Sequence, residues 1–499
     1  IALISNWVEQ GAVEGAAADL PRTPVFVEGW QMGRPDAIVK AEKPYQLPAG
    51  GNDQYWNFIF RNPVKQTRWL KGMEVRPGDK HVVHHANILV DRMESARAQE
   101  SSPGTGFGGM EIKIESEAFD PDGHFLFWKP GTIPYTEPEG MALRLDPGTD
   151  LVLNIHLQPS GKAELVQPSL GLYFTDQPAT RFPMLLQLEN DQKLDIPPGD
   201  KNFVVADEFT MPEDVELLAI YPHAHYIGRD LEAFATFPDG TKKSLIHIPD
   251  WDLNWQAVYR YESPVELPAG TVVSMRYRYD NSDENIRNPN IPPKRVVGGN
   301  RASDEMAHLW LQVLPGTAPG ETGDPRRVLQ EAMARHNVEK NPADFEGHYN
   351  LGAMLQARGQ LPDALQQYEL ALRIRPSDAT LNNAAGGVSL AAGHPDAAEK
   401  YLEAALRSRP NYFDAHYNLG IALATQNNFA GAVEHFRAAV QLNEADANAQ
   451  ANLGAALAET GNLKEARTHL EKALAIDPTL ANARENLEQI KRAVPGDQR

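Results

Sequence analysis

The stretch Leu419–Gly454 reads LGIALATQNNFAGAVEHFRAAVQLNEADANAQANLG, and its opening Leu-Gly pair returns 34 residues later. The same interval separates three sets of small residues: Gly352, Gly386, Gly420 and Gly454; Ala364, Ala398, Ala432 and Ala466; and Ala371, Ala405, Ala439 and Ala473. Prolines end most of the units, at Pro376, Pro410 and Pro478, and Glu444 stands in the remaining one. Small residues at fixed positions let paired helices approach closely, and stacked pairs bury a face that one pair alone could not bury.

This pattern resembles the tetratricopeptide repeat (TPR), a two-helix unit of about 34 residues. We expect an all-α TPR solenoid over residues 325–495, with a first helix at 325–341, four repeats, and a closing helix from Leu480 to Val494. A Gly/Pro/Thr-rich linker at 317–324 precedes it. Such arrays commonly hold a protein partner in a concave groove, and bracing of the preceding domains is the alternative role.

The region before the repeats has a strand pattern. Short alternating runs such as Trp56–Phe60, Leu151–Leu157 and Val272–Tyr279 are separated by turns such as Pro147-Gly148. Many short strands with closely spaced turn signals predict antiparallel β-sandwiches. Because the pattern fills both halves, we expect two jelly-roll-like sandwich domains, at residues 24–182 and 183–316, followed by the TPR solenoid.

Composition narrows the functional classes. The chain has 499 residues, which is too long for a single core, and its apolar content of 42% is that of globular domains. A formal net charge of −20 argues against nucleic acid as a partner, since binding it requires clustered Lys and Arg. No uncharged apolar run reaches about eighteen residues, so we expect no membrane span. The absence of cysteine excludes thiolate metal sites and disulfides.

The opening segment, Ile1–Gly11, resembles the last helix of a c-type cytochrome domain. We therefore expect residues 1–23 to form a helix remnant and a linker, and an upstream cytochrome would suit as an electron donor. No signal peptide is recognised at this end.

Two histidines in the second β region follow an apolar run. His223-Ala224-His225 comes directly after Leu217–Ile220, which places both imidazoles on or at the end of a strand. Residues two apart in a strand share a face and lie about 7 Å apart, which suits two ligands of one ion. Tyr221 shares that face. A lone His-x-His also fits ordinary structural histidines.

One distant methionine completes this ligand set. In Met306–Val313, the face that carries Met306, His308 and Trp310 is too polar and too large for an ordinary interior. An isolated methionine usually fills a gap in a core, but this one has a histidine and a tryptophan beside it. A thioether favours Cu(I) and imidazole serves both oxidation states, so the set predicts a copper that cycles between them.

The first β region carries another imidazole group. His84 and His85 are adjacent, so in a regular strand they would point to opposite faces. They can bind one metal only if the strand bends, bulges or ends there, or if they use different ring nitrogens. His156 alternates with Asn154 on the polar face of an apolar strand, and Asn154 is a candidate for hydrogen bonding to a ligand. His81 is another such candidate, an alternative metal ligand, or a solvent-facing residue. Structural histidines remain the alternative for each imidazole.

With these groups in view, residues 24–316 resemble the copper type II, ascorbate-dependent monooxygenases, the family of peptidylglycine α-hydroxylating monooxygenase and dopamine β-monooxygenase. The matching stretches are His84-His85, the strand with His156, Tyr221–Gly228 and Gly299–Met306.

The resemblance implies two copper ions per chain. An electron-storing copper would be held by His84, His85 and His156. A second copper, which activates O2, would be held by His223, His225 and Met306. The implied reaction is hydroxylation of a C–H bond in a small organic substrate, with electrons from ascorbate or a cytochrome. The resemblance also implies a periplasmic or extracellular location.

The chain departs from the family in three respects. It has none of the disulfides of the animal members. Tyr221 stands where the peptide-amidating enzyme has an arginine that grips a carboxylate, and His308 and Trp310 replace an asparagine and a tyrosine. We therefore expect Tyr221, His308 and Trp310 to line a pocket for a neutral or aromatic molecule rather than a peptide C-terminus.

Two other functions are compatible with the residues. One is a copper-binding or electron-transfer protein without oxygenase activity, whose repeats act as a docking scaffold. The other is a His-ligated zinc hydrolase, against which Met306 argues, because zinc rarely takes a thioether.

Overall fold

The computed structural model describes residues 6–8, 10–12, 29–110, 112, 114, 123–301, 303–316 and 324–493. Most of the predicted N-terminal segment, and residues 317–323 of the predicted linker, lie outside the described residues. The chain forms two compact units, one of Ile1–Ser116 with Phe125–Arg181, the other of Glu117–His124 with Phe182–Arg499. Among the helices that are described, none has the length and apolarity needed to cross a membrane.

The first unit is built from antiparallel sheets. One sheet has the spatial order β1 (Ala37–Lys40), β11 (Ser169–Thr175), β4 (Arg68–Arg76) and β8 (Leu143–Leu145). The other has the order β6 (Phe107–Gly108), β3 (Gln54–Arg61), β9 (Asp150–Leu157), β5 (Val83–Asp91) and β7 (Phe127–Trp128). A short pair joins β2 (Tyr45–Leu47) to β10 (Glu164–Val166). The two larger sheets share one apolar core, which includes Phe58, Leu153 and Leu172, as in a sandwich.

The β part of the second unit repeats this plan. One sheet has the order β12 (Met184–Glu189), β21 (His308–Pro315), β15 (Val215–His223) and β18 (Tyr259–Leu267). The other has the order β14 (Phe203–Thr210), β19 (Val272–Tyr279), β16 (Gly228–Thr236) and β17 (Lys242–Ile248), and β13 (Asp195–Ile196) pairs with β20 (Val296–Val297). Leu186, Leu231 and Tyr277 belong to the core between them. The prediction of antiparallel β-sheets before a helical region is confirmed.

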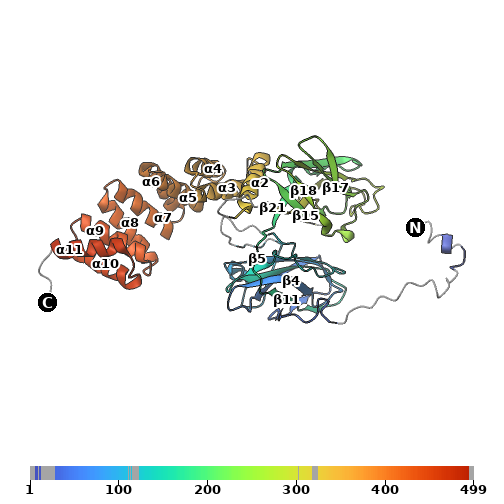
Figure 1. The fold of residues 1–499 in the computed structure, drawn as a ribbon, viewed down its shortest axis with the longest axis horizontal. Coiled ribbons are helices and arrows are strands. Elements are labelled where there is room, and N and C mark those ends of the chain that lie inside the picture. The colour runs from blue at the N-terminus through green and yellow to red at the C-terminus, as the bar shows by residue number, and fades with distance from the viewer. Residues whose placement is uncertain are drawn as a thin grey trace. The chain divides into compact units, whose positions relative to one another are not determined.

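The helices follow one another in antiparallel pairs, from gold at α2 to red at α11 in Figure 1. They are α2 (Arg326–Lys340), α3 (Phe345–Ala357), α4 (Leu361–Ile374), α5 (Ala379–Ala391), α6 (Pro395–Ser408), α7 (Phe413–Thr425), α8 (Phe429–Leu442), α9 (Ala447–Glu459), α10 (Leu463–Ile476) and α11 (Ala481–Ala493).

The turn inside each helix pair needs a left-handed residue. Gly359, Gly393 and Gly461 have φ values of 74°, 78° and 81°, and Asn427 at the equivalent position has 61°. Glycine adopts this region without a steric penalty, and asparagine is among the few other residues that tolerate it. Asn427 in the third repeat therefore allows the same turn that glycine allows in the other repeats.

A polar side chain closes the loop between successive repeats. At the same position of the first helix in each repeat, a side-chain nitrogen donates to a backbone carbonyl six residues earlier. The pairs are His348 with Pro342 (3.3 Å), Asn382 with Pro376 (3.0 Å), His416 with Pro410 (2.9 Å) and Gln450 with Glu444 (3.0 Å). Because imidazole and carboxamide both offer an N–H donor, the residue type varies while the bond is kept.

Helix α2 packs on two sides. Leu329 and Met333 belong to the core of the second β part, whereas Val338 packs with the first helices of the repeats. The sequence placed residues 325–341 with the repeats alone. The helix therefore joins the TPR array to the β sheets of the same unit (Figure 1).

Candidate metal centres

A β-bulge brings two adjacent histidines together in the first unit. Along the pairing of β5 with β9 the register shifts between Val83 and His85, so His84 is the extra residue and His85 lies opposite His156. A bulge bends its strand and redirects a side chain. This is the departure from a regular strand that the sequence required for both histidines to face one point.

The three imidazoles converge through the same ring atom. Nδ1 of His84 lies 3.1 Å from Nδ1 of His85 and 3.3 Å from Nδ1 of His156. One ring nitrogen carries either a proton or a lone pair, so His84 cannot form two good hydrogen bonds there. One metal ion about 2.0–2.1 Å from each nitrogen would satisfy all three. Among the described residues, these three are the ones whose His, Cys or carboxylate ligand atoms gather in this way.

Asp53 orients the third imidazole. Its Oδ2 lies 2.9 Å from Nε2 of His156, and the ring of Tyr55 stacks on the imidazole at 4.5 Å. Burial lowers the pKa of His156 and outweighs the opposing effect of Asp53. The Nε2–H bond to the carboxylate leaves the lone pair on Nδ1, the tautomer that a metal ligand needs. No local sequence pattern marks Asp53 as a partner of His156.

Two other expected contributors have different surroundings. The buried amide of Asn154 donates to Asn57 Oδ1 at 2.6 Å and to Gly109 O at 3.4 Å. His81 is exposed, and its backbone N–H donates to Asp79. Asn154 thus links β9 to β3, and Asp53 is the carboxylate that is hydrogen-bonded to His156.

In the second unit, His223 ends β15 and His225 lies in the turn before β16. Their ring centroids are 5.2 Å apart, with the planes at 84°. Nδ1 of His223 lies 2.6 Å from Gln256 Oε1, and Nδ1 of His225 lies 2.9 Å from the carbonyl of Asp304. Because a carbonyl only accepts, both Nδ1 atoms donate and both Nε2 atoms keep their lone pairs.

These two imidazoles are neutral. Burial, followed by the effect of His225, lowers the pKa of His223 to about 3. Burial also lowers the pKa of His225. Because a metal displaces a proton from a charged imidazole but not from a neutral one, both rings are ready to bind metal at neutral pH.

A buried carboxyl group fixes the segment that carries Met306 against the His225 turn. Glu305 accepts the backbone N–H of His225 at 3.0 Å and that of Ile227 at 3.4 Å. Burial raises the pKa of Glu305 well above its ordinary value. The hydroxyl of Tyr279 donates to the carbonyl of Met306 at 2.7 Å. The backbone of Met306 is therefore held beside one of the two histidines.

A loop far from both histidines in sequence supports them. Trp251 Nε1 donates to the carbonyls of Ala224 (3.2 Å) and His225 (3.1 Å). Five residues later, Gln256 Oε1 accepts from His223 and, at 3.2 Å, from the Tyr221 hydroxyl. Nothing in the local sequence pattern shows which carbonyls this loop reaches.

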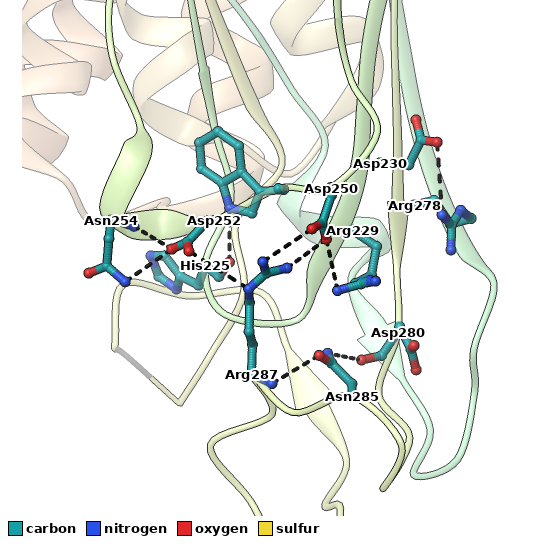
Figure 2. A network of polar contacts seen from close by, with 11 residues as sticks. His225, Arg229, Asp230, Asp250, Asp252, Asn254, Arg278, Asp280, Asn285 and Arg287 are labelled. Atoms are coloured by element: carbon teal, nitrogen blue, oxygen red, sulfur yellow. Dashed lines mark hydrogen bonds and ion pairs between the residues drawn. The ribbon is translucent and has the colours of Figure 1, made fainter. Parts of the chain in front are cut away.

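Charged side chains hold this loop in place. Figure 2 shows Arg287 beside Asp250 and Asp252, with Arg229 on Asp250 as well. Arg287 Nη1 lies 2.7 Å from Asp250 Oδ1, and Arg229 Nη1 lies 3.1 Å from the same atom. Asp252 also accepts the N–H of Asn254 at 2.9 Å. A guanidinium that bridges two carboxylates gives the loop a defined geometry.

The predicted substrate residues share one face with His223. In the pairing of β15 with β21, His223 is opposite His308 and Tyr221 is opposite Trp310. The face is less open than the sequence suggested, because His308 is only 8% exposed and Gln312 only 3%. Asp191 and the carbonyl of Gly123 accept hydrogen bonds from these two side chains, which lets polar groups be buried.

Comparisons with known proteins identify the helical region. A family model for the tetratricopeptide repeat matches residues 323–379, 386–447 and 425–481. A search of curated proteins finds no match. The C-terminal region is therefore an array of tetratricopeptide repeats, as predicted.

Solved structures with similar helices include YrrB, described as a TPR protein with an unusual peptide-binding site. It is 23% identical, with a TM-score of 0.31, and the match covers 33% of this chain and 84% of that one. A MamA structure is 20% identical, covers 31% of this chain and 88% of that one, and has a TM-score of 0.29. MamA from Desulfovibrio magneticus RS-1 is 21% identical, covers 31% and 88%, and has a TM-score of 0.30.

Proposed function

We propose that this chain is a copper-dependent monooxygenase, which hydroxylates a C–H bond of a small organic substrate with O2 and an external one-electron reductant. The observation that carries the proposal is the convergence of three imidazoles, in which Nδ1 of His84 lies 3.1 Å from Nδ1 of His85 and 3.3 Å from Nδ1 of His156. In the second pair, Nδ1 of His223 donates to Gln256 and Nδ1 of His225 donates to Asp304. The Nε2 lone pairs of both imidazoles are therefore available to a metal.

The donor sets fit copper better than zinc. Imidazole binds both Cu(I) and Cu(II), and a thioether at Met306 would favour Cu(I). Zinc sites take imidazole, carboxylate or thiolate, and this chain has no cysteine. When bound, copper would supply one-electron redox chemistry at both positions and a binding site for O2 at the second.

The remaining side chains prepare the ligands and the substrate face. Asp53, Gln256 and the carbonyl of Asp304 each hold one ring nitrogen, so the other keeps its lone pair. The face beside His223 consists of two aromatic rings and an imidazole, from Tyr221, Trp310 and His308. None of these three side chains carries a guanidinium group. This face favours a neutral or aromatic substrate over a carboxylate.

The repeat array suits binding of a protein partner, for which stacked helical repeats offer an extended surface. The family resemblance extends the proposal to a periplasmic or extracellular setting, where ascorbate or a cytochrome would supply electrons.

The test is copper stoichiometry in the full chain, beside His156→Ala and Met306→Ala, together with ascorbate-dependent O2 consumption coupled to a hydroxylated product. We expect two coppers in the wild type and one in each variant. Two coppers that ascorbate reduces, without product from any neutral aromatic compound, would indicate an electron-transfer protein instead. Zinc in protein purified without added metal would overturn the copper assignment.

A further inference from the structure

A buried carboxylate lies where helix α2 meets the second β part. Asp207, on β14, is 6% exposed. It accepts from Lys340 Nζ at 2.7 Å, from His336 Nε2 at 3.1 Å, and from the backbone N–H of Glu189 at 3.1 Å. Lys340 also donates to the carbonyl of Glu189 at 2.5 Å. A buried charge persists only with such pairing, so these partners hold one another firmly.

Glu189, whose backbone is hydrogen-bonded to this cluster, begins a segment that extends to the second candidate site. Asp191 lies two residues after Glu189, at the start of a 3-10 turn (Asp191–Lys193). Its Oδ1 accepts the backbone N–H of Ala307 at 2.7 Å, and its Oδ2 lies 2.8 Å from His308 Nε2. Ala307 in turn accepts the N–H of Asn190 at 3.2 Å. Segment 189–191 is thus tied to α2 on one side and to residues 307–308, directly after Met306, on the other.

Asp191 also leaves the His308 ring with one free nitrogen. Because the carboxylate accepts from Nε2–H, the lone pair of His308 lies on Nδ1. That Nδ1 atom is buried and has no hydrogen-bond partner, and the ring lies 6.3 Å from that of His223. Asp191 is the nearer of two carboxylates at this imidazole, since Glu189 Oε2 lies 3.6 Å from the same Nε2 atom.

We propose that α2, the helix at the head of the repeat array, is a positioning element of the second candidate metal site. Lys340 and His336 fix Asp207 and Glu189, and Asp191 transmits that position to His308 and to the backbone beside Met306. The proposal rests on the proposed function in that it treats this site as a copper site. It gives the repeat array a structural role at that site, separate from any partner that the array binds.

The geometry distinguishes this role from simple bracing. Leu329 and Met333 supply the apolar contact between α2 and the β core, which braces the helix. Asp207, by contrast, binds two side chains of α2, and one of them, Lys340, also donates to the backbone carbonyl of Glu189. Loss of a bracing contact would lower stability and leave the imidazole of His308 unchanged, whereas loss of a positioning contact would alter that imidazole.

The experiment compares Lys340→Met with Lys340→Arg in the full chain. Arg335→Met is the matched control, because Arg335 pairs with Glu331 within the same helix and is 42% exposed. The first readout needs no metal: imidazole 1H–15N correlation spectra report the tautomer and hydrogen bonding of His308, assigned with His308→Gln. We expect Lys340→Met to shift the His308 nitrogens, Lys340→Arg to restore them in part, and Arg335→Met to leave them unchanged.

The second readout is copper at the second site, measured in a His156→Ala background so that the first site does not contribute. Outer hydrogen-bond partners of metal ligands change affinity by about 10–100-fold. Lys340 acts through Glu189 and Asp191 and contacts no candidate ligand, so we expect a smaller rise in Kd, of up to about tenfold, with a changed cupric EPR spectrum. Unchanged His308 resonances and an unchanged Kd in Lys340→Met, with only a lower Tm, would overturn the proposal. If no variant binds copper but the resonances shift, the positioning role stands and the copper assignment fails.

Discussion

Two neighbouring glycines of α5 allow a sharp test of why the repeats carry glycine at a fixed position. A Cβ added to Gly386 would lie 2.6 Å from Cγ and 2.8 Å from Cδ2 of Leu402, on the paired helix α6. A Cβ added to Gly387 would meet nothing within 4 Å. Leu402 is fully buried, so it has no room to retreat. We therefore compare Gly386→Ala with Gly387→Ala.

The two substitutions share one favourable effect and differ in one unfavourable effect. Alanine is more favourable than glycine inside a helix by about 0.8–1.0 kcal/mol. At Gly387 this gain is unopposed, so the free energy of unfolding should rise by up to about 1 kcal/mol. At Gly386 the extra methyl group overpacks the helix interface, which costs about 1–3 kcal/mol. Gly386→Ala should therefore be about 1–3 kcal/mol less stable than Gly387→Ala.

Urea unfolding of the full chain, followed by circular dichroism at a helical wavelength, measures this difference. The comparison of midpoints holds only if both variants keep the same m-value, because a changed slope would signal a changed unfolding unit. The double variant Gly386→Ala/Leu402→Ala provides a check, since removing the opposing side chain should remove the clash. Equal stabilities of the two alanine variants would refute the close-approach explanation for the recurring glycine.

Three further perturbations test the sites and the array. Asp53→Ala removes the carboxylate that sets the imidazole tautomer in the first candidate site, and copper titration should show affinity there reduced by about 10–100-fold with the second site unaffected. Gln256→Leu removes the corresponding acceptor in the second site, and the loss should appear there alone, to a similar degree. Burial, followed by the effect of His416, lowers the pKa of His435, so the array should be stable above pH of about 6.5 and lose stability as pH falls below it. The first repeat has a glutamine, Gln367, at the equivalent position. The variant His435→Gln should therefore flatten that part of the pH–Tm profile. An unchanged slope would contradict the assignment of this pH dependence to His435.

The elements that sequence patterns predict are those with a repeating physical cause. The 34-residue spacing of small residues reflects contacts made once per repeat, such as Gly420 against Phe436. Alternating runs predict strands because one face of each sandwich strand is buried. The adjacent histidines His84 and His85 could face one metal only if their strand were irregular, and the β-bulge lies at that position.

The partners that orient the ligands could not be predicted in the same way. Asp53 and His156 are 103 positions apart, and His225 and Asp304 are 79 apart. No local periodicity connects such residues, because they meet only once the strands have paired. The same reason applies to α2: it has few apolar residues, and only the fold decides that Leu329 packs on a β core while Val338 packs on the repeats.

The hydrogen bonds show why local motifs can suggest candidate ligands but cannot specify how these side chains are oriented. Each candidate imidazole with an assigned tautomer donates one N–H to an oxygen from a different element: Asp53 for His156, Gln256 for His223 and Asp304 for His225. The ligand atoms therefore acquire their direction only when distant segments have folded together. Metal affinity at either site should consequently depend on the integrity of the whole β unit, since an unfolded His-x-His or His-His would offer its nitrogens in random orientations.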